Sequence, residues 1–79
     1  MARPAISAEE RELRSAQLLD AAATLLRDNP ARIPSVAEVA EQAGIAKGAV
    51  YLYFRSKEEL LLALHERHMT AFFLALTEL

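Results

Sequence analysis

The amino-acid sequence predicts a small all-α protein in which three helices precede a long fourth one. Its 79 residues include sixteen alanines and thirteen leucines but only two glycines, a composition that favours helix over sheet. No segment shows the alternation of apolar and polar residues expected of a half-buried strand. Three Ser-x-x-Glu sequences, each typical of a helix N-terminus, divide the chain. The length allows one domain.

The first helix is expected to begin at Ser7, which would form a capping box with Glu10. Its apolar residues recur at helical spacing, at Leu13, Leu18, Ala22, Leu25 and Leu26. Pro30 ends the helix, because proline disfavours the helical conformation of the residue before it. A second capping box, formed by Ser35 and Glu38, begins a short second helix.

A helix-turn-helix is predicted over about residues 35–54. Gly44 follows the second helix, at a position where glycine adopts the left-handed conformation at little cost. A third helix is expected over about residues 46–54. Ala40 is small enough to let the two helices cross closely, and Val50 can pack back against it.

The last capping box, Ser56 with Glu59, begins the fourth helix. The first three helices are expected to cover this helix only as far as about Leu64, so that residues 65–79 project beyond them. The projecting part carries apolar residues at helical spacing: Met69, Phe72, Phe73, Leu76 and Leu79.

The composition restricts the possible functions. Without cysteine, the chain has no disulfide, no thiolate zinc site and no thiol nucleophile. Its apolar runs are too short to span a membrane, and its N-terminus is unlike a secretory signal, so we expect a soluble cytoplasmic protein with no membrane partner. The net charge of −2 argues weakly against a nucleic-acid partner. Residues 44–57, however, contain three basic residues and no acid, which would favour an anion at that face: Lys47, Arg55 and Lys57.

The segment from Gly44 to Leu60 closely resembles the signature of the tetracycline-repressor (TetR) family of bacterial regulators. It reads Gly-Ile-Ala-Lys-Gly-Ala-Val-Tyr-Leu-Tyr-Phe-Arg-Ser-Lys-Glu-Glu-Leu. The leucine and alanine pairs between Leu18 and Leu26 resemble the family's first helix, and the segment from Ser35 to Ala40 resembles the start of its second. Two positions depart from the family pattern. Pro30 and Ala31 replace a common glycine-aromatic pair, and Ala46 replaces a Ser or Thr whose capping is typically worth about 1 kcal/mol.

The resemblance implies a homeodomain-like DNA-binding headpiece over residues 14–64. Residues 1–13 would form an N-terminal arm and the start of the first helix. Residues 65–79 would continue the fourth helix toward a ligand-binding and dimerisation domain that this sequence lacks. The implied function is that of a bacterial, nucleoid-associated transcriptional regulator and not of an enzyme. Most members of the family are ligand-responsive repressors that bind a palindromic double-stranded operator as a homodimer.

The resemblance also implies roles for individual residues. Lys47, Gly48 and Ala49 would lie at the base edges of the major groove, where Lys47 meets either a base or a phosphate. The remaining contacts would go to the DNA backbone, from Ser35, Ala37, Tyr51, Tyr53 and Lys57. One of the two tyrosines is also expected to contribute to the core. Ala40, Gly44 and Val50 would shape the turn.

Other classes of function have weaker support. His65 and His68 share a helix face, but their spacing differs from that of a zinc-protease helix and no further ligand cluster accompanies them, so no metal or cofactor is expected. The sequence has no hydrolase elbow and no phosphate-binding glycine loop. The stronger alternative is a helical interaction module that uses the apolar residues after position 68. Salt-sensitive retention on duplex DNA would distinguish it from a DNA-binding protein.

Overall fold

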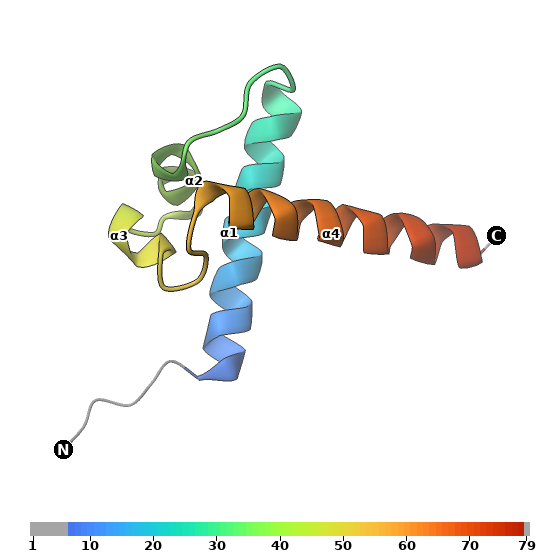
Figure 1. The fold of residues 1–79 in the computed structure, drawn as a ribbon, viewed down its shortest axis with the longest axis horizontal. Helices are drawn as coiled ribbons and strands as arrows, with labels where there is room; N and C mark the ends of the chain where they lie inside the picture. Colours follow the sequence, from blue (N-terminus) through green and yellow to red (C-terminus); the bar gives the residue numbers. More distant parts are fainter. Residues whose placement is uncertain (1–6, 79) are drawn as a thin grey trace.

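The structure is a computed structural model that describes residues 7–78 (Figure 1). It contains four helices and no strand within these residues, which confirms the predicted all-α fold class. The helices are α1 (Ala8–Asp28), α2 (Val36–Ala43), α3 (Lys47–Val50) and α4 (Lys57–Thr77). The first six residues of the expected N-terminal arm and Leu79 of the expected apolar face lie outside the described residues.

The helices pack around the middle of α1. The shorter helices α2 and α3 lie to one side of α1, while α4 crosses it and projects away (Figure 1). All four helical segments contribute to one buried cluster, made of Leu18, Ala21, Ala22, Val39, Ala40, Val50, Phe54, Leu60 and Leu64. Leu64 is the last buried residue of α4, as the sequence predicts, and residues 65–78 are all exposed. Leu13 shares the helical spacing of the apolar residues in α1 but is 57% exposed, because it precedes the buried part of that helix.

Serine caps begin α1 and α2. The Ser7 hydroxyl accepts a hydrogen bond from the backbone N–H of Glu10 at 3.0 Å. In α2 the capping box is complete, because the Ser35 hydroxyl accepts from the Glu38 N–H at 3.1 Å and the Glu38 carboxylate accepts from the Ser35 N–H at 3.0 Å. Both caps satisfy N–H groups that have no partner inside their own helix.

The cap of α4 differs from the predicted box in one bond. The Ser56 hydroxyl accepts from the Glu59 N–H at 3.1 Å, as expected. The Glu59 carboxylate instead accepts from the N–H of Arg55 at 3.4 Å, one residue before the cap.

An ion pair of 2.7 Å between Asp20 and Arg67 joins α1 to α4 just beyond the buried part of α4. Both side chains are substantially exposed, and such surface pairs contribute about 0–1 kcal/mol.

A Schellman motif ends α2 and sets the turn toward α3. Gly44 has φ 72° and ψ 29°, in the left-handed region. Its N–H donates to the Glu41 carbonyl at 3.2 Å, and the Ile45 N–H donates to the Ala40 carbonyl at 2.9 Å. These two bonds are the pair that defines the motif, and they satisfy carbonyls left free at the helix end.

The third helix is shorter than the sequence predicts. Regular α-helix ends at Val50, four residues before the expected end at Phe54. The chain continues in tighter turns, in which the Leu52 N–H donates to the Ala49 carbonyl at 3.1 Å and the Tyr53 N–H to the Val50 carbonyl at 2.9 Å. Burial of Phe54 draws the chain back to the core before α4, so these bonds follow the three-residue pattern of a tightened helix end.

Candidate nucleic-acid interface

The α3 segment has one buried side and one exposed side. Val50 is 1% exposed and lies in the same buried cluster as Ala40 of α2. Lys47 and Gly48 are exposed, and Tyr51 is 49% exposed. Packing therefore fixes the segment through Val50 and leaves the opposite side, with its single positive charge at Lys47, in solvent.

Gly48 leaves the backbone of α3 uncovered. A Cβ atom added at this position would meet no other atom within 4 Å, so the protein's own packing does not require glycine there. Ala49 beside it is half-buried. The backbone at Gly48 can therefore be approached closely by another molecule.

The two tyrosines of this segment have different surroundings. Tyr53 is half-buried and packs against the core, as expected for one of the pair. Its ring centroid lies 5.8 Å from the guanidinium carbon of Arg11, within the range of a cation–π interaction. Tyr51 projects into solvent, so its hydroxyl is available to an external acceptor.

The remaining candidates lie on the neighbouring helices. Ser35 and Ala37 are exposed at the start of α2, and Ser35 already caps that helix. Lys57 is exposed as the first residue of α4. The candidates therefore lie at the starts of α2 and α4, in α3, and in the turn that follows α3.

Two arginines near these residues were not singled out from the sequence. Arg11 donates a hydrogen bond of 2.8 Å to the Leu52 carbonyl, a contact between residues 41 positions apart that no local pattern indicates. Arg32 forms a two-pronged ion pair with Glu38, at 2.7 and 2.8 Å. The bonds from Arg32, together with those from Ser35, lower the pKa of Glu38 to about 2. This ion pair fastens the loop before α2 to the first turn of that helix.

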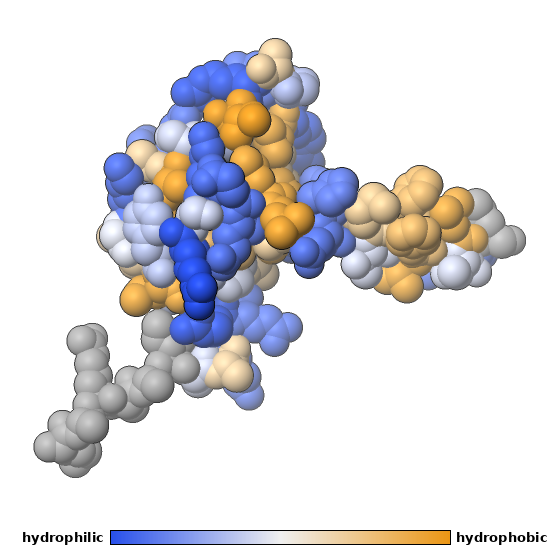
Figure 2. Space-filling model, in the orientation of Figure 1, coloured by the Kyte–Doolittle hydropathy of each residue, from blue (hydrophilic) through white to orange (hydrophobic). Residues whose placement is uncertain are grey.

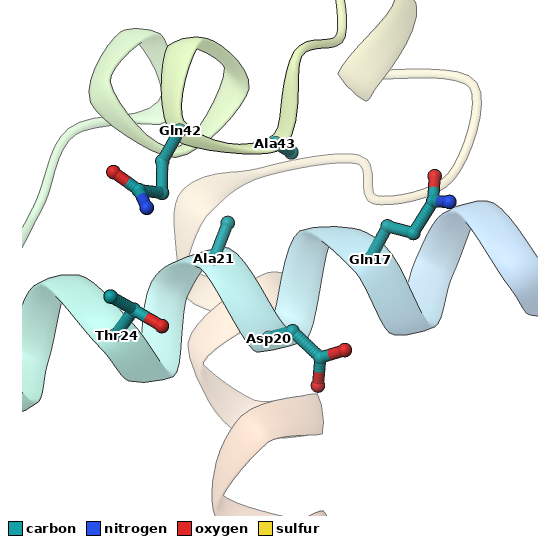
Figure 3. A pocket seen from close by; sticks show the side chains of 6 residues that line it. All are labelled: Gln17, Asp20, Ala21, Thr24, Gln42 and Ala43. Carbon is teal, nitrogen blue, oxygen red and sulfur yellow. The ribbon is translucent and has the colours of Figure 1, made fainter.

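An open groove of about 300 Å³ lies between α1 and α2 (Figure 3). It is lined by Gln17, Asp20, Ala21, Thr24, Gln42 and Ala43. None of the candidate DNA-binding residues lines it. In Figure 3 the side chains of Gln17, Asp20 and Thr24 project from α1, and that of Gln42 from α2.

His65 and His68 are both exposed on α4. Within the part of the chain that the structure describes, no three His, Cys, Asp or Glu residues are grouped as metal ligands would be. None of the helices in residues 7–78 has the length and apolar character needed to cross a membrane.

Comparison with known proteins shows the family of this chain. Residues 18–64, which include the buried cluster and the turn between α2 and α3, match the family described as "Bacterial regulatory proteins, tetR family". The chain belongs to the TetR family. Members of this family are DNA-binding transcriptional regulators of the helix-turn-helix type, and the matched residues contain α2, the Gly44 turn and α3.

Curated relatives of this TetR-family chain match most of its length. The chain is 39% identical over 56 residues to the fatty acid metabolism regulator protein of Bacillus subtilis, a match of 71% of this chain and 29% of the relative. It is 44% identical over 66 residues to the HTH-type transcriptional regulator EthR of Mycobacterium tuberculosis, a match of 84% of this chain and 28% of the relative. The chain thus spans less than a third of these relatives' length. No solved structure gave a significant match.

Proposed function

We propose that residues 14–64 form the DNA-binding headpiece of a TetR-family transcriptional regulator and that α3 is its recognition helix. The observation that carries the proposal is the two-sided character of α3. Val50 is buried at 1% exposure, whereas Lys47, Gly48 and Tyr51 face solvent. A helix held from one side in this way can enter a major groove about 12 Å wide with its other side.

The exposed residues divide into two kinds of contact. Lys47 would reach a guanine edge, and Gly48 and Ala49 would let the helix backbone approach the bases. Five residues on the flanking helices and turns would meet the sugar-phosphate backbone, namely Ser35, Ala37, Tyr51, Tyr53 and Lys57. Tyr53 has the least freedom among them, because its ring already packs between the core and Arg11. Backbone contacts fix the position of the protein on DNA, and the α3 contacts would specify sequence.

The whole protein would be larger than this chain, in keeping with the length of its relatives. Residues 65–79 would continue α4 into a further domain that binds a small-molecule effector and forms a homodimer. Two headpieces about one helical turn of DNA apart would then bind a palindromic operator. We propose that the protein acts in the bacterial cytoplasm as a repressor released by its effector.

Selection of bound sequences from a random duplex library tests the DNA-binding proposal. The affinity of this 79-residue chain for a selected duplex and for a scrambled duplex of equal composition is then measured over a range of salt concentrations. We expect tighter binding to the selected duplex, and a linear fall of log affinity with log salt for both. Equal affinity for the two duplexes would contradict sequence-specific recognition, and affinity independent of salt would contradict phosphate contacts.

A second candidate function, a helical interaction module, rests on the distal part of α4. Phe72 and Phe73 are 58% and 57% exposed, and the distal helix is mostly apolar on the visible face (Figure 2). Self-association without retention on any duplex would favour this function alone. The two functions are compatible, since α4 projects away from α3 (Figure 1).

A further inference from the structure

Arg11 links the first turn of α1 to the turn that follows the recognition helix. Its Nη1 donates to the Leu52 carbonyl at 2.8 Å, and its guanidinium lies over the Tyr53 ring. Within residues 7–78, the only other side-chain polar contact between residues more than six positions apart is the ion pair of Asp20 with Arg67. Arg11 is thus the α1 side chain that donates a hydrogen bond to the turn after α3.

The Leu52 carbonyl lies at a point where the backbone needs an external donor. Regular helix ends at Val50, and the last carbonyls of a helix and of the turn after it have no partner further along that helix. A cation is also favoured near such an end, where the carbonyl dipoles point outward. Arg11 supplies both the donor and the charge.

The residues held by this contact are those that face outward. Tyr51 and Leu52 are 49% and 55% exposed, so little packing of their own fixes the backbone that carries them. Tyr53 is held between the core and the Arg11 guanidinium. Arg11 therefore constrains residues 51–53 through two contacts, a hydrogen bond to the Leu52 carbonyl and a cation–π contact with the Tyr53 ring.

We infer that Arg11 is a positioning residue for DNA recognition: it fixes the turn at residues 51–53 so that Tyr51 and Leu52 are presented to the duplex in one arrangement. The inference rests on the proposed DNA-binding function. It assigns Arg11 a role through the protein backbone and not a phosphate contact of its own, because Nη1 donates to the Leu52 carbonyl and the guanidinium lies over the Tyr53 ring.

Arg14 provides a matched control. It lies one turn further along α1, is exposed, and bonds only to Gln17 of its own helix, at 3.1 Å, among the side-chain contacts of residues 7–78. Arg11→Ala and Arg14→Ala remove the same charge, so any general electrostatic effect on DNA binding is closely similar in both. Arg11→Lys and Arg14→Lys form a second pair that keeps the charge but replaces the planar guanidinium.

The test measures the affinity of the parent chain and the four variants for a selected duplex as a function of salt. We expect Arg11→Ala to bind roughly three- to tenfold more weakly than Arg14→Ala, which is the scale of one lost hydrogen bond of ordinary strength. The salt dependence of the two variants should be equal. Arg11→Lys should lie between Arg11→Ala and the parent. In the DNA-free chain, amide hydrogen exchange at Tyr53 should be faster in Arg11→Ala than in Arg14→Ala.

Each alternative outcome has a distinct meaning. A salt slope lower by about one unit in Arg11→Ala than in Arg14→Ala would show that Arg11 contacts a phosphate, and would overturn the positioning role. Equal affinities of the two alanine variants would overturn it as well. Should thermal unfolding show Arg11→Ala unfolded at the assay temperature, the lysine pair decides, and equal affinities within that pair overturn the inference. Failure of the parent chain to bind any duplex would instead refute the proposed function.

Discussion

Gly44 and Gly48 lie on either side of the start of α3, and they differ in backbone conformation. Gly44 has φ 72°, whereas Gly48 lies inside the helix without a positive φ. An added Cβ atom would meet nothing within 4 Å at either position. Any cost of replacing Gly44 therefore comes from its backbone conformation, and any cost of replacing Gly48 comes from a partner that approaches α3.

Gly44→Val is expected to destabilise the protein and to weaken DNA binding together. A β-branched residue is strongly disfavoured at positive φ, and such strain costs on the order of 1–3 kcal/mol. In a domain of this size, that cost lowers the melting temperature by roughly 4–8 °C per kcal/mol. Gly44→Asn should be milder, because asparagine tolerates the left-handed region. Equal melting temperatures of Gly44→Val and the parent would contradict the assigned turn.

Gly48→Ala is expected to separate stability from DNA binding. Alanine in a helix interior is favoured over glycine by roughly 0.5–1 kcal/mol, so the melting temperature should stay the same or rise. Affinity for the selected duplex should nevertheless fall, because the new methyl group stands where the α3 backbone would approach the bases. Thermal unfolding and duplex titration of the same preparation check both halves. Unchanged affinity would mean that the DNA does not approach α3 closely at this residue.

Lys47→Ala and Tyr51→Phe are expected to affect DNA binding in different ways. If Lys47 meets a base, its loss should weaken binding to the selected duplex by about 1–3 kcal/mol and binding to a scrambled duplex much less. Tyr51→Phe should weaken binding to both duplexes alike, since a phosphate contact carries no base information. Titrating each variant with both duplexes checks this difference.

Lys57→Ala is the matched control for Lys47→Ala, because both remove one exposed lysine. A phosphate contact from Lys57 predicts equal losses on the two duplexes and a salt slope smaller by about one unit. If Lys47→Ala behaves in the same way as Lys57→Ala, then Lys47 contacts a phosphate and not a base.

Features that depend on neighbouring residues could be predicted from the sequence. Serine caps begin α1, α2 and α4 at the expected positions, and the left-handed Gly44 ends α2, because a few adjacent residues determine each of these structures. The expected limit of the core at about Leu64 agrees with the exposure of residues 65–78.

The features that differ from the sequence-based predictions, or that no local pattern indicates, depend on contacts between distant residues. The early end of α3 depends on how Phe54 is drawn into a core that α1 and α4 complete, and helix periodicity carries no such information. The bond from Arg11 to Leu52 has no signal in the sequence, because it joins residues 41 positions apart.

The ion pair of Glu38 predicts a dependence of stability on pH. In the folded protein the pKa of Glu38 falls from 4.5 to about 2, chiefly through its bonds to Arg32 and Ser35. Because the folded pKa is the lower one, the pair stabilises the protein fully above about pH 5, and this contribution is lost as the pH falls from about 5 to about 2. Glu38→Gln removes the charge but keeps a side chain suited to a capping box.

We therefore expect Glu38→Gln to be less stable than the parent at pH 7 and to approach it as the pH falls to about 2–3. The measurement is denaturant unfolding of both proteins over that pH range. Glu41→Gln is the control, since Glu41 is exposed on the same helix and forms no ion pair among residues 7–78. A difference between Glu38→Gln and the parent that stays constant with pH would contradict the role of the charge.

The distal part of α4 is more extensively apolar than the expected single face. Leu74 is 59% exposed in addition to the predicted Met69, Phe72, Phe73 and Leu76 (Figure 2). The rings of Phe72 and Phe73 meet edge to face at a centroid distance of 6.0 Å, and both remain open to solvent. A helix that is apolar around most of its circumference is typically buried by neighbours on several sides. In the isolated 79-residue chain, a second copy is the available neighbour.

We expect this chain to self-associate through residues 69–78. Fully burying one large apolar side chain is worth about 1.5–3 kcal/mol, so covering several of them favours association strongly. The double variant Phe72→Ser and Phe73→Ser should sediment as a monomer and keep the melting temperature of the headpiece, because both residues lie beyond Leu64. Its affinity for a palindromic duplex should also fall, since its two headpieces are no longer linked.

Leu62→Ser is the matched control for this variant. Leu62 is 57% exposed on α4 but belongs to the headpiece and lies outside the distal apolar segment. It should leave both sedimentation and palindrome affinity unchanged, because a single exposed leucine contributes little to association. A parent chain that sediments as a monomer at high micromolar concentration, with the amides of residues 69–78 protected from exchange, would contradict self-association. The distal helix would then have to fold back onto its own headpiece.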